Sequence, residues 1–103
     1  MKAKMNNFKT WINTCDERFL EKTFDDILQR SKFSILGRVK HYFEPFGFTC
    51  LWLLGESHFA IHTFPEENKT YIELSSCVDL PFNEFKKIFN NTMARPPLNA
   101  TIR

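Results

Sequence analysis

The chain has 103 residues, of which 43% are hydrophobic and twelve are Phe, which suits one domain with a modest buried core. Lysine and arginine exceed aspartate and glutamate by only two, and the charges are dispersed, which argues against nucleic-acid binding. No apolar run approaches the ~20 residues that span a bilayer, and residues 1–7 lack the apolar core of a signal peptide, so we expect no membrane association.

Three cysteines, Cys15, Cys50 and Cys77, stand far apart in the sequence. An odd number at wide spacing is typical of reduced thiols rather than of a disulfide framework, which favours a cytoplasmic protein. His58 and His62 would share one face of a helix, but on a strand they would lie ~13 Å apart, so no metal site is expected.

The sequence begins with a predicted strand at 8–13, followed by a helix. The segment Thr14-Cys15-Asp16-Glu17 has the form of a capping box, in which Thr14 caps the helix and Glu17 reaches back to the cap. Apolar residues then recur at helical spacing as far as about Arg30, so this helix has one apolar face. These apolar residues are Phe19, Leu20, Phe24, Ile27 and Leu28.

Four further strands are predicted, at 33–43, 48–54, 59–64 and 70–77. Gly37 in the first of them is typical of a β-bulge. The strand at 48–54 is almost continuously apolar, which indicates burial on both faces. Gly55-Glu56 is expected to form a tight hairpin loop in which Gly55 adopts the unusual φ angle.

A second helix is predicted to begin at Asp79, with Pro81 in the first turn, where its missing N–H does no harm. Phe82, Phe85, Ile88 and Phe89 give this helix an apolar face. Asn90-Asn91 is expected to end it, and 98–102 could form an edge strand or be disordered.

These elements predict one α+β domain over 1–103, a two-layer sandwich of an antiparallel sheet with two helices on one face. Because the strand at 48–54 requires burial of both faces, the second face of the sheet must meet another chain. We therefore expect a homodimer in which sheet packs on sheet with the helices outside, a four-layer αββα arrangement.

Residue counting along the predicted hairpins places the candidate reactive groups relative to one another. If Phe64 pairs with Thr70, Ser57 lies opposite Cys77, with their Cβ atoms ~5 Å apart.

If Gly55-Glu56 is a two-residue loop, Thr49 lies opposite His62. Ser57 and His62 have opposite parity and would point to opposite faces of a regular strand. A bulge or a sharp turn near Ser57 is expected to bring them to one face.

The run Glu56-Ser57-His58, the run His62-Thr63 with Pro65-Glu66 after it, and Cys77 beyond resemble a known processing-site signature. This signature is typical of the small prokaryotic S-adenosylmethionine decarboxylases. These are pyruvoyl-dependent carboxy-lyases that are made as proenzymes and cut themselves. The resemblance extends over roughly residues 33–90, and the Ser-to-His and His-to-Cys spacings both agree. It implies the same αββα dimer.

The resemblance implies that the Ser57 hydroxyl attacks the Glu56 carbonyl and converts the amide into an ester. β-Elimination and loss of ammonia then leave a covalent pyruvoyl group at residue 57, so that the chain becomes two, 1–56 and 57–103. The ketone would capture the substrate amine as a Schiff base and serve as the electron sink for decarboxylation. The product would enter polyamine (spermidine) synthesis.

The resemblance also implies roles for three further residues. His62 matches the proton acceptor of self-processing, and Thr49 stands where the family generally has a serine that assists processing. Cys77 matches the donor that returns a proton to the substrate carbon. Taken singly, His62 could be a core histidine, Cys77 a small apolar filler and Thr49 an ordinary strand residue.

Three residues are candidates for substrate binding. Glu56 would become a C-terminus beside the site and could bind a cationic substrate, while Trp11 and Phe46 could stack on a nucleoside. The family usually carries an imidazole and carboxylates ahead of the first helix, whereas the strand at 8–13 has Lys9 and Trp11 and no acid.

Two alternatives therefore stay open. A pyruvoyl decarboxylase of the same fold could act on arginine or ornithine instead of S-adenosylmethionine. A non-catalytic paralogue could keep the fold and serve as a binding or assembly partner, and the joint retention of Ser57, His62 and Cys77 argues against it.

Overall fold

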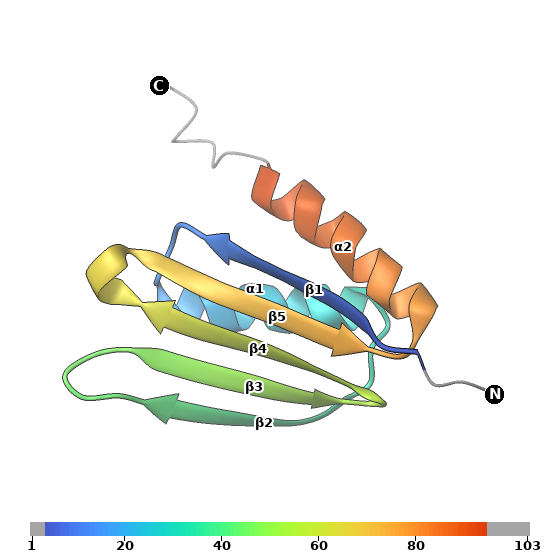
Figure 1. Cartoon of the computed structure of the whole chain (residues 1–103), viewed down its shortest axis with the longest axis horizontal. Helices are drawn as coiled ribbons and strands as arrows, with labels where there is room; N and C mark the ends of the chain where they lie inside the picture. Colours follow the sequence, from blue (N-terminus) through green and yellow to red (C-terminus); the bar gives the residue numbers. More distant parts are fainter. Residues whose placement is uncertain (1–3, 95–103) are drawn as a thin grey trace.

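The computed structural model describes residues 4–94, which form a five-stranded antiparallel sheet and two α-helices (Figure 1). The elements are β1 (Asn6–Ile12), α1 (Glu17–Arg30), β2 (Ile35–Tyr42), β3 (Phe48–Leu54), β4 (Ser57–Phe64), the 3-10 turn η1 (Pro65–Glu67), β5 (Lys69–Ser76) and α2 (Asp79–Ala94).

The strand order in the sheet is β1-β5-β4-β3-β2. Strands β2 to β5 form a meander of antiparallel hairpins, and β1 pairs with β5 at the far edge. α1 lies behind the sheet and runs roughly along the direction of the strands (Figure 1). As predicted, the β2–β3 ladder has an irregularity, which lies between Ile35 and Gly37.

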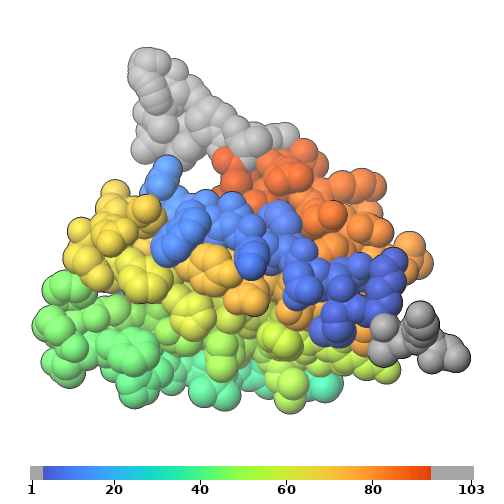
Figure 2. All heavy atoms as spheres, in the orientation of Figure 1, coloured from blue at the N-terminus to red at the C-terminus, as the bar shows by residue number. Residues whose placement is uncertain are grey.

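The two faces of the sheet have different surroundings. On β3, Phe48, Cys50 and Trp52 face the helices and are at most 1% exposed, whereas Leu51 and Leu53 on the other face are 44% and 58% exposed. The expectation that this strand is buried on both faces is therefore wrong for a single chain. In the space-filling view the uncovered face, here called the open face, is toward the viewer (Figure 2).

Both helices bury their apolar stripes in one core against the other face. Phe24 of α1 packs on Phe59 of β4 and on Phe85 of α2, with ring centroids 4.9 and 6.4 Å apart. Phe8 of β1 meets Phe85 and Phe89 edge to face. This arrangement confirms the predicted two-layer α+β sandwich with two helices on one face.

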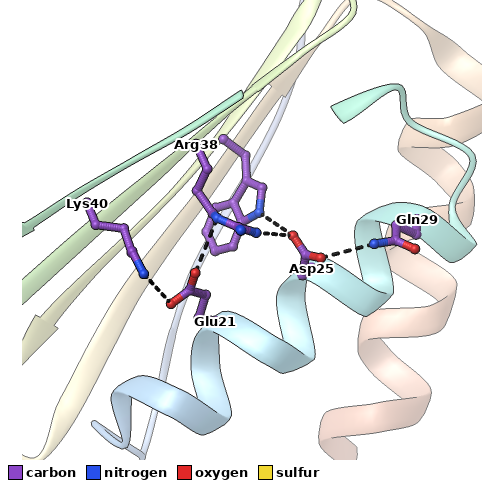
Figure 3. A network of polar contacts seen from close by, with 6 residues as sticks. Glu21, Asp25, Gln29, Arg38 and Lys40 are labelled. Carbon is purple, nitrogen blue, oxygen red and sulfur yellow. Dashed lines mark hydrogen bonds and ion pairs between the residues drawn. The ribbon is translucent and has the colours of Figure 1, made fainter. Parts of the chain in front are cut away.

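A polar network ties α1 to the β2 edge of the sheet (Figure 3). Trp52 is fully buried, and its indole N–H donates to the carboxylate of Asp25 at 3.0 Å. Arg38 of β2 donates to the same carboxylate oxygen at 2.6 Å and to Glu21 at 3.2 Å, and Lys40 also pairs with Glu21. The buried donor is thus satisfied, as burial of an indole requires.

Two boundary predictions need correction, and a third falls outside the described residues. α1 is capped by Asp16, whose carboxylate accepts the Phe19 N–H at 3.0 Å, so the predicted Thr14 capping box is wrong. α2 continues to Ala94, past Asn90-Asn91. The segment 98–102 lies outside the described residues.

Candidate active site

The predicted cleavage point lies in the turn between β3 and β4. Leu54 pairs with Ser57, so Gly55-Glu56 is a two-residue loop as predicted. The positive φ of this loop falls on Glu56, at 58°, and not on Gly55 as expected. A left-handed conformation at a residue with a side chain costs on the order of 1 kcal/mol or more, so the residue before the Glu56–Ser57 bond is strained.

The Glu56 carbonyl oxygen is held by Cys77. The Cys77 backbone N–H donates to it at 3.4 Å, and the thiol donates to it at 3.3 Å. The thiol also lies 3.8 Å from a carboxylate oxygen of Glu56. Two donors therefore converge on the carbonyl that the Ser57 hydroxyl would attack.

The Ser57 side chain points into the helix-facing layer and is 7% exposed. Ser57 pairs with Ser76, so the prediction that it lies opposite Cys77 is wrong by one residue. The cause is the loop after β4, where Asn68 adopts a φ of 53° and Phe64 pairs with Lys69 instead of Thr70.

Ser57 donates a hydrogen bond of 2.7 Å from its hydroxyl to the Ser76 hydroxyl. The sequence did not point to Ser76. With Phe64 paired with Lys69, counting back along the two strands places Ser76 opposite Ser57.

His62 lies on the open face, where it pairs with Thr49 as predicted. The Thr49 hydroxyl is 2.9 Å from His62 Nδ1, which leaves Nε2 free for proton exchange. On its other side the imidazole stacks on Tyr71, with ring centroids 6.4 Å apart and planes inclined by 21°. One row across the sheet contains Trp11, Tyr71, His62, Thr49 and His41.

His62 and Ser57 are not brought together within one chain. β4 pairs in continuous register from Ser57 to Phe64, so the bulge expected near Ser57 is absent from this described strand. Five residues of regular strand separate the two by ~16 Å, and their side chains lie on opposite faces of the sheet.

A cavity of about 430 Å³ adjoins His62 at the β2–β3 loop. Its lining includes Phe43, Phe46 and Phe64, with Thr49, His62 and Glu66. Of the predicted substrate-binding residues, Phe46 therefore lies beside His62, Trp11 lies in the same row of the sheet, and Glu56 lies at the opposite end beside Cys77.

Burial shifts two pKa values near these groups. Burial, together with the nearby Glu21 charge, raises the pKa of the Cys50 thiol from 9.0 to about 12, so this cysteine stays protonated. Burial and the Glu73 carboxylate raise the pKa of Tyr71 above its ordinary value. Within residues 4–94 no three His, Cys, Asp or Glu side chains are grouped to bind a metal, and no helix in this span is long and apolar enough to cross a membrane.

A sequence model of the S-adenosylmethionine decarboxylase family matches residues 12–95. The chain belongs to the S-adenosylmethionine decarboxylase family. The S-adenosylmethionine decarboxylase proenzyme of Prochlorococcus marinus (strain MIT 9313) is 41% identical over 64 residues, which are 62% of this chain and 51% of the relative. S-adenosylmethionine decarboxylase proenzyme 2 of Bacillus cereus is 40% identical over 62 residues, 60% of this chain and 50% of the relative. The chain thus spans about half the length of these relatives.

Among solved structures, the adenosylmethionine decarboxylase from Aquifex aeolicus superposes with a TM-score of 0.71 at 15% identity. The superposition covers 94% of this chain and 86% of that chain. The family resemblance and the predicted two-layer α+β fold of the single chain are both confirmed.

Proposed function

We propose that the chain is a proenzyme that cuts itself between Glu56 and Ser57 and then acts as a pyruvoyl-dependent S-adenosylmethionine decarboxylase. The observation that carries this proposal is the Glu56 carbonyl, which accepts two hydrogen bonds from Cys77 and directly precedes the Ser57 hydroxyl. Family membership supports the same chemistry.

The first step is an N-to-O acyl shift. The Ser57 Oγ attacks the Glu56 carbonyl carbon, and the negative charge that develops on the carbonyl oxygen is stabilised by the Cys77 N–H and thiol. When this intermediate collapses, the C–N bond breaks, the hydroxyl proton ends on the nitrogen, and Glu56 is joined to Ser57 by an ester.

The second step is elimination. A base removes the Cα proton of residue 57. The ester then breaks between Oγ and Cβ of residue 57, and the main-chain carboxylate of Glu56 leaves. The resulting enamine tautomerises to an imine, and one water hydrolyses it with release of ammonia, which gives the pyruvoyl group on 57–103. This group would supply an electron sink for decarboxylation, and Cys77, whose thiol contacts the Glu56 carbonyl oxygen, would return a proton to the substrate carbon.

His62 of the same chain is ~16 Å from Ser57 along β4, so if His62 is this base it has to come from a second chain. Residue 57 is the first residue of β4, and the open face is the face of the sheet opposite to its side chain. A second copy whose sheet packs on this face, about 10 Å away, could supply His62 if its strands ran in the opposite direction. A two-fold axis that crosses the strands near Ala60 would place the Glu56–Ser57 turn of each copy over the His62–Thr49 pair of the other.

The open face suits such a homodimer. Val39, Leu51, Leu53 and Trp11 are all at least 44% exposed on it in the single chain. Large apolar side chains exposed on one face of a folded domain favour an interaction site, and a sheet-on-sheet contact would bury these side chains. This gives the predicted four-layer αββα dimer.

The cavity beside His62 is proposed to receive the substrate nucleoside between aromatic rings, with Glu66 and the new C-terminal Glu56 of the partner copy offering negative charge to the sulfonium. The product would serve polyamine synthesis, including spermidine, in the cytoplasm.

Denaturing mass spectrometry of purified protein tests the proposal. The expected result is two fragments, 1–56 and 57–103, with the second blocked by a pyruvoyl group. Ser57→Ala should remain whole because it has no hydroxyl for the ester. A wild-type chain that stays intact after prolonged incubation would contradict the proposal and favour a non-catalytic paralogue.

A further inference from the structure

The Ser76 hydroxyl has three polar contacts, and they fix the direction of its bond with Ser57. It accepts the Val78 N–H at 3.0 Å and lies 3.3 Å from the Val78 carbonyl oxygen, which can only accept. A hydroxyl has one proton and two lone pairs. The Ser76 proton is therefore directed to Val78, and its remaining lone pair must accept the Ser57 proton at 2.7 Å.

This arrangement orients the nucleophile. Ser57 and Ser76 are 7% and 0% exposed, so bulk solvent has little access to compete for the Ser57 proton. With its proton held by Ser76, the Ser57 oxygen keeps its lone pairs free. Fixing one rotamer of a reacting group removes part of the entropic cost of attack.

The same Ser76 side chain also shapes the turn that carries Cys77. Its bond to the Val78 N–H closes a local turn at the end of β5, of the kind that serine side chains form with the backbone two residues on. Cys77 lies inside this turn, and its N–H and thiol there reach the Glu56 carbonyl oxygen.

We propose that Ser76 is a positioning residue for self-cleavage, which holds the Ser57 hydroxyl and the Cys77 donors on the two sides of the bond to be cut. The proposal rests on self-processing at Glu56–Ser57. Ser76 acts through the two residues it holds and is not the final proton acceptor, because a serine hydroxyl is too weak a base for that role.

The test compares the cleavage rates of wild type, Ser76→Ala, Ser76→Thr and Ser75→Ala by denaturing mass spectrometry over time. Ser75 is a matched control, because its hydroxyl is also buried and donates a 2.6 Å bond, but to Asn7 and away from Ser57. We expect Ser76→Ala to cleave at least about tenfold more slowly than wild type, whereas Ser75→Ala stays within about twofold. Ser76→Thr keeps the hydroxyl and should recover most of the lost rate.

Thermal unfolding of each variant in the Ser57→Ala background, where no chain is cut, separates stability from processing. If Ser76→Ala does not fold, Ser76→Thr and Ser76→Val decide the matter, since they have similar shapes and only the first retains a hydroxyl. Suppose that wild type cleaves and that Ser76→Ala cleaves at the rate of Ser75→Ala, or faster than wild type. This result would overturn the role of Ser76 and leave self-processing intact. Wild type that never cleaves would instead count against the proposed function.

Discussion

The Cys77 thiol lies 3.3 Å from the Glu56 carbonyl oxygen, although Cys77 is not the strand partner of either residue in the turn. Ser76 is the last residue of β5, and the chain turns directly after it, so the Cys77 N–H points at the same oxygen as the thiol. In the proposed function this cysteine would act twice, first on the oxyanion of self-cleavage and later as a proton donor to the substrate carbon.

Cys77→Ala should therefore separate the two stages. The backbone N–H remains, so we expect cleavage to continue, slowed by less than the roughly hundredfold that loss of a strong oxyanion donor costs. Decarboxylation should be poor, and the pyruvoyl group should be consumed by transamination, because the proton is returned to the wrong atom. Mass spectrometry follows cleavage, and CO2 release follows turnover. Turnover equal to that of wild type would show that Cys77 is not the donor.

Two inactive variants should complement each other if His62 acts across a dimer. Ser57→Ala keeps His62 but has no nucleophile, and His62→Ala keeps the nucleophile but lacks the base. In a mixed dimer, His62 of the Ser57→Ala copy should complete processing of the other chain. We expect the pyruvoyl-blocked fragment 57–103 only when the two variants are co-expressed with different tags.

Each variant expressed alone is the control. His62→Ala alone should stall before the pyruvoyl appears. If it processes fully, His62 is not the proton acceptor. If the co-expressed pair forms mixed dimers and still gives no blocked fragment, the sheet-to-sheet arrangement with reversed strands is wrong.

The sequence predicts one half of this site more accurately than the other. The Thr49–His62 pair follows from a two-residue loop, whose length leaves a single register. The sequence predicts Cys77 opposite Ser57, whereas the structure has Ser76 there. The loop between β4 and β5 is one residue shorter than predicted, and it closes with Asn68 at a positive φ. A shift of one residue changes the face of every side chain in a strand, so this small error hid Ser76.

Other misjudged features depend on competition between neighbours. Thr14 and Asp16 are both good N-cap residues, and in the structure Asp16 is the cap. Likewise the apolar run of β3 predicts burial of both faces, but the second face is left open in a single chain. The fold class follows from periodicity, whereas the contacts at the turn require coordinates.

Asp25→Ala should destabilise the protein much more than Asp26→Ala. Loss of the Asp25 carboxylate leaves the buried Trp52 N–H without its acceptor, which costs about 1–3 kcal/mol. Asp26 pairs only with Arg30, and both side chains are more than half exposed, so its loss should cost less than about 0.5 kcal/mol. Thermal unfolding in the Ser57→Ala background measures both, and equal shifts in Tm would contradict the structural role of Asp25.

The buried Cys50 thiol should make the protein less stable in alkaline solution. Its pKa is about 12 in the folded chain against 9.0 for an ordinary thiol, so below pH 9 both states are protonated and the difference has no effect. As the pH rises from 9 towards 12, the unfolded chain loses the proton first and unfolding becomes more favourable, by on the order of 1 kcal/mol at pH 10. Urea unfolding of Ser57→Ala and Ser57→Ala/Cys50→Ala at pH 8 and pH 10 should show this loss only when Cys50 is present. A parallel fall in both proteins would assign it to other groups.

The last prediction concerns the substrate, for which Trp11 and Phe46 have different surroundings. The ammonium of Lys69 lies 5.1 Å from the centroid of the Trp11 ring, and Phe64 and Tyr71 pack against the same indole. Both side chains are about half exposed, Trp11 at 50% and Phe46 at 53%, but of the two only Phe46 lines the cavity beside His62.

We therefore expect Phe46→Ala to raise the KM for S-adenosylmethionine by about tenfold, since loss of a stacking ring removes roughly 1 kcal/mol or more, and Trp11→Ala to raise it less. Arginine and ornithine lack a flat nucleoside to stack, so wild type should release CO2 from S-adenosylmethionine in preference to either. The measurement is CO2 release from the three compounds with fully processed protein. Release from arginine or ornithine alone would overturn this order while leaving the pyruvoyl mechanism standing, because that mechanism requires only an amine and a carboxylate on one carbon.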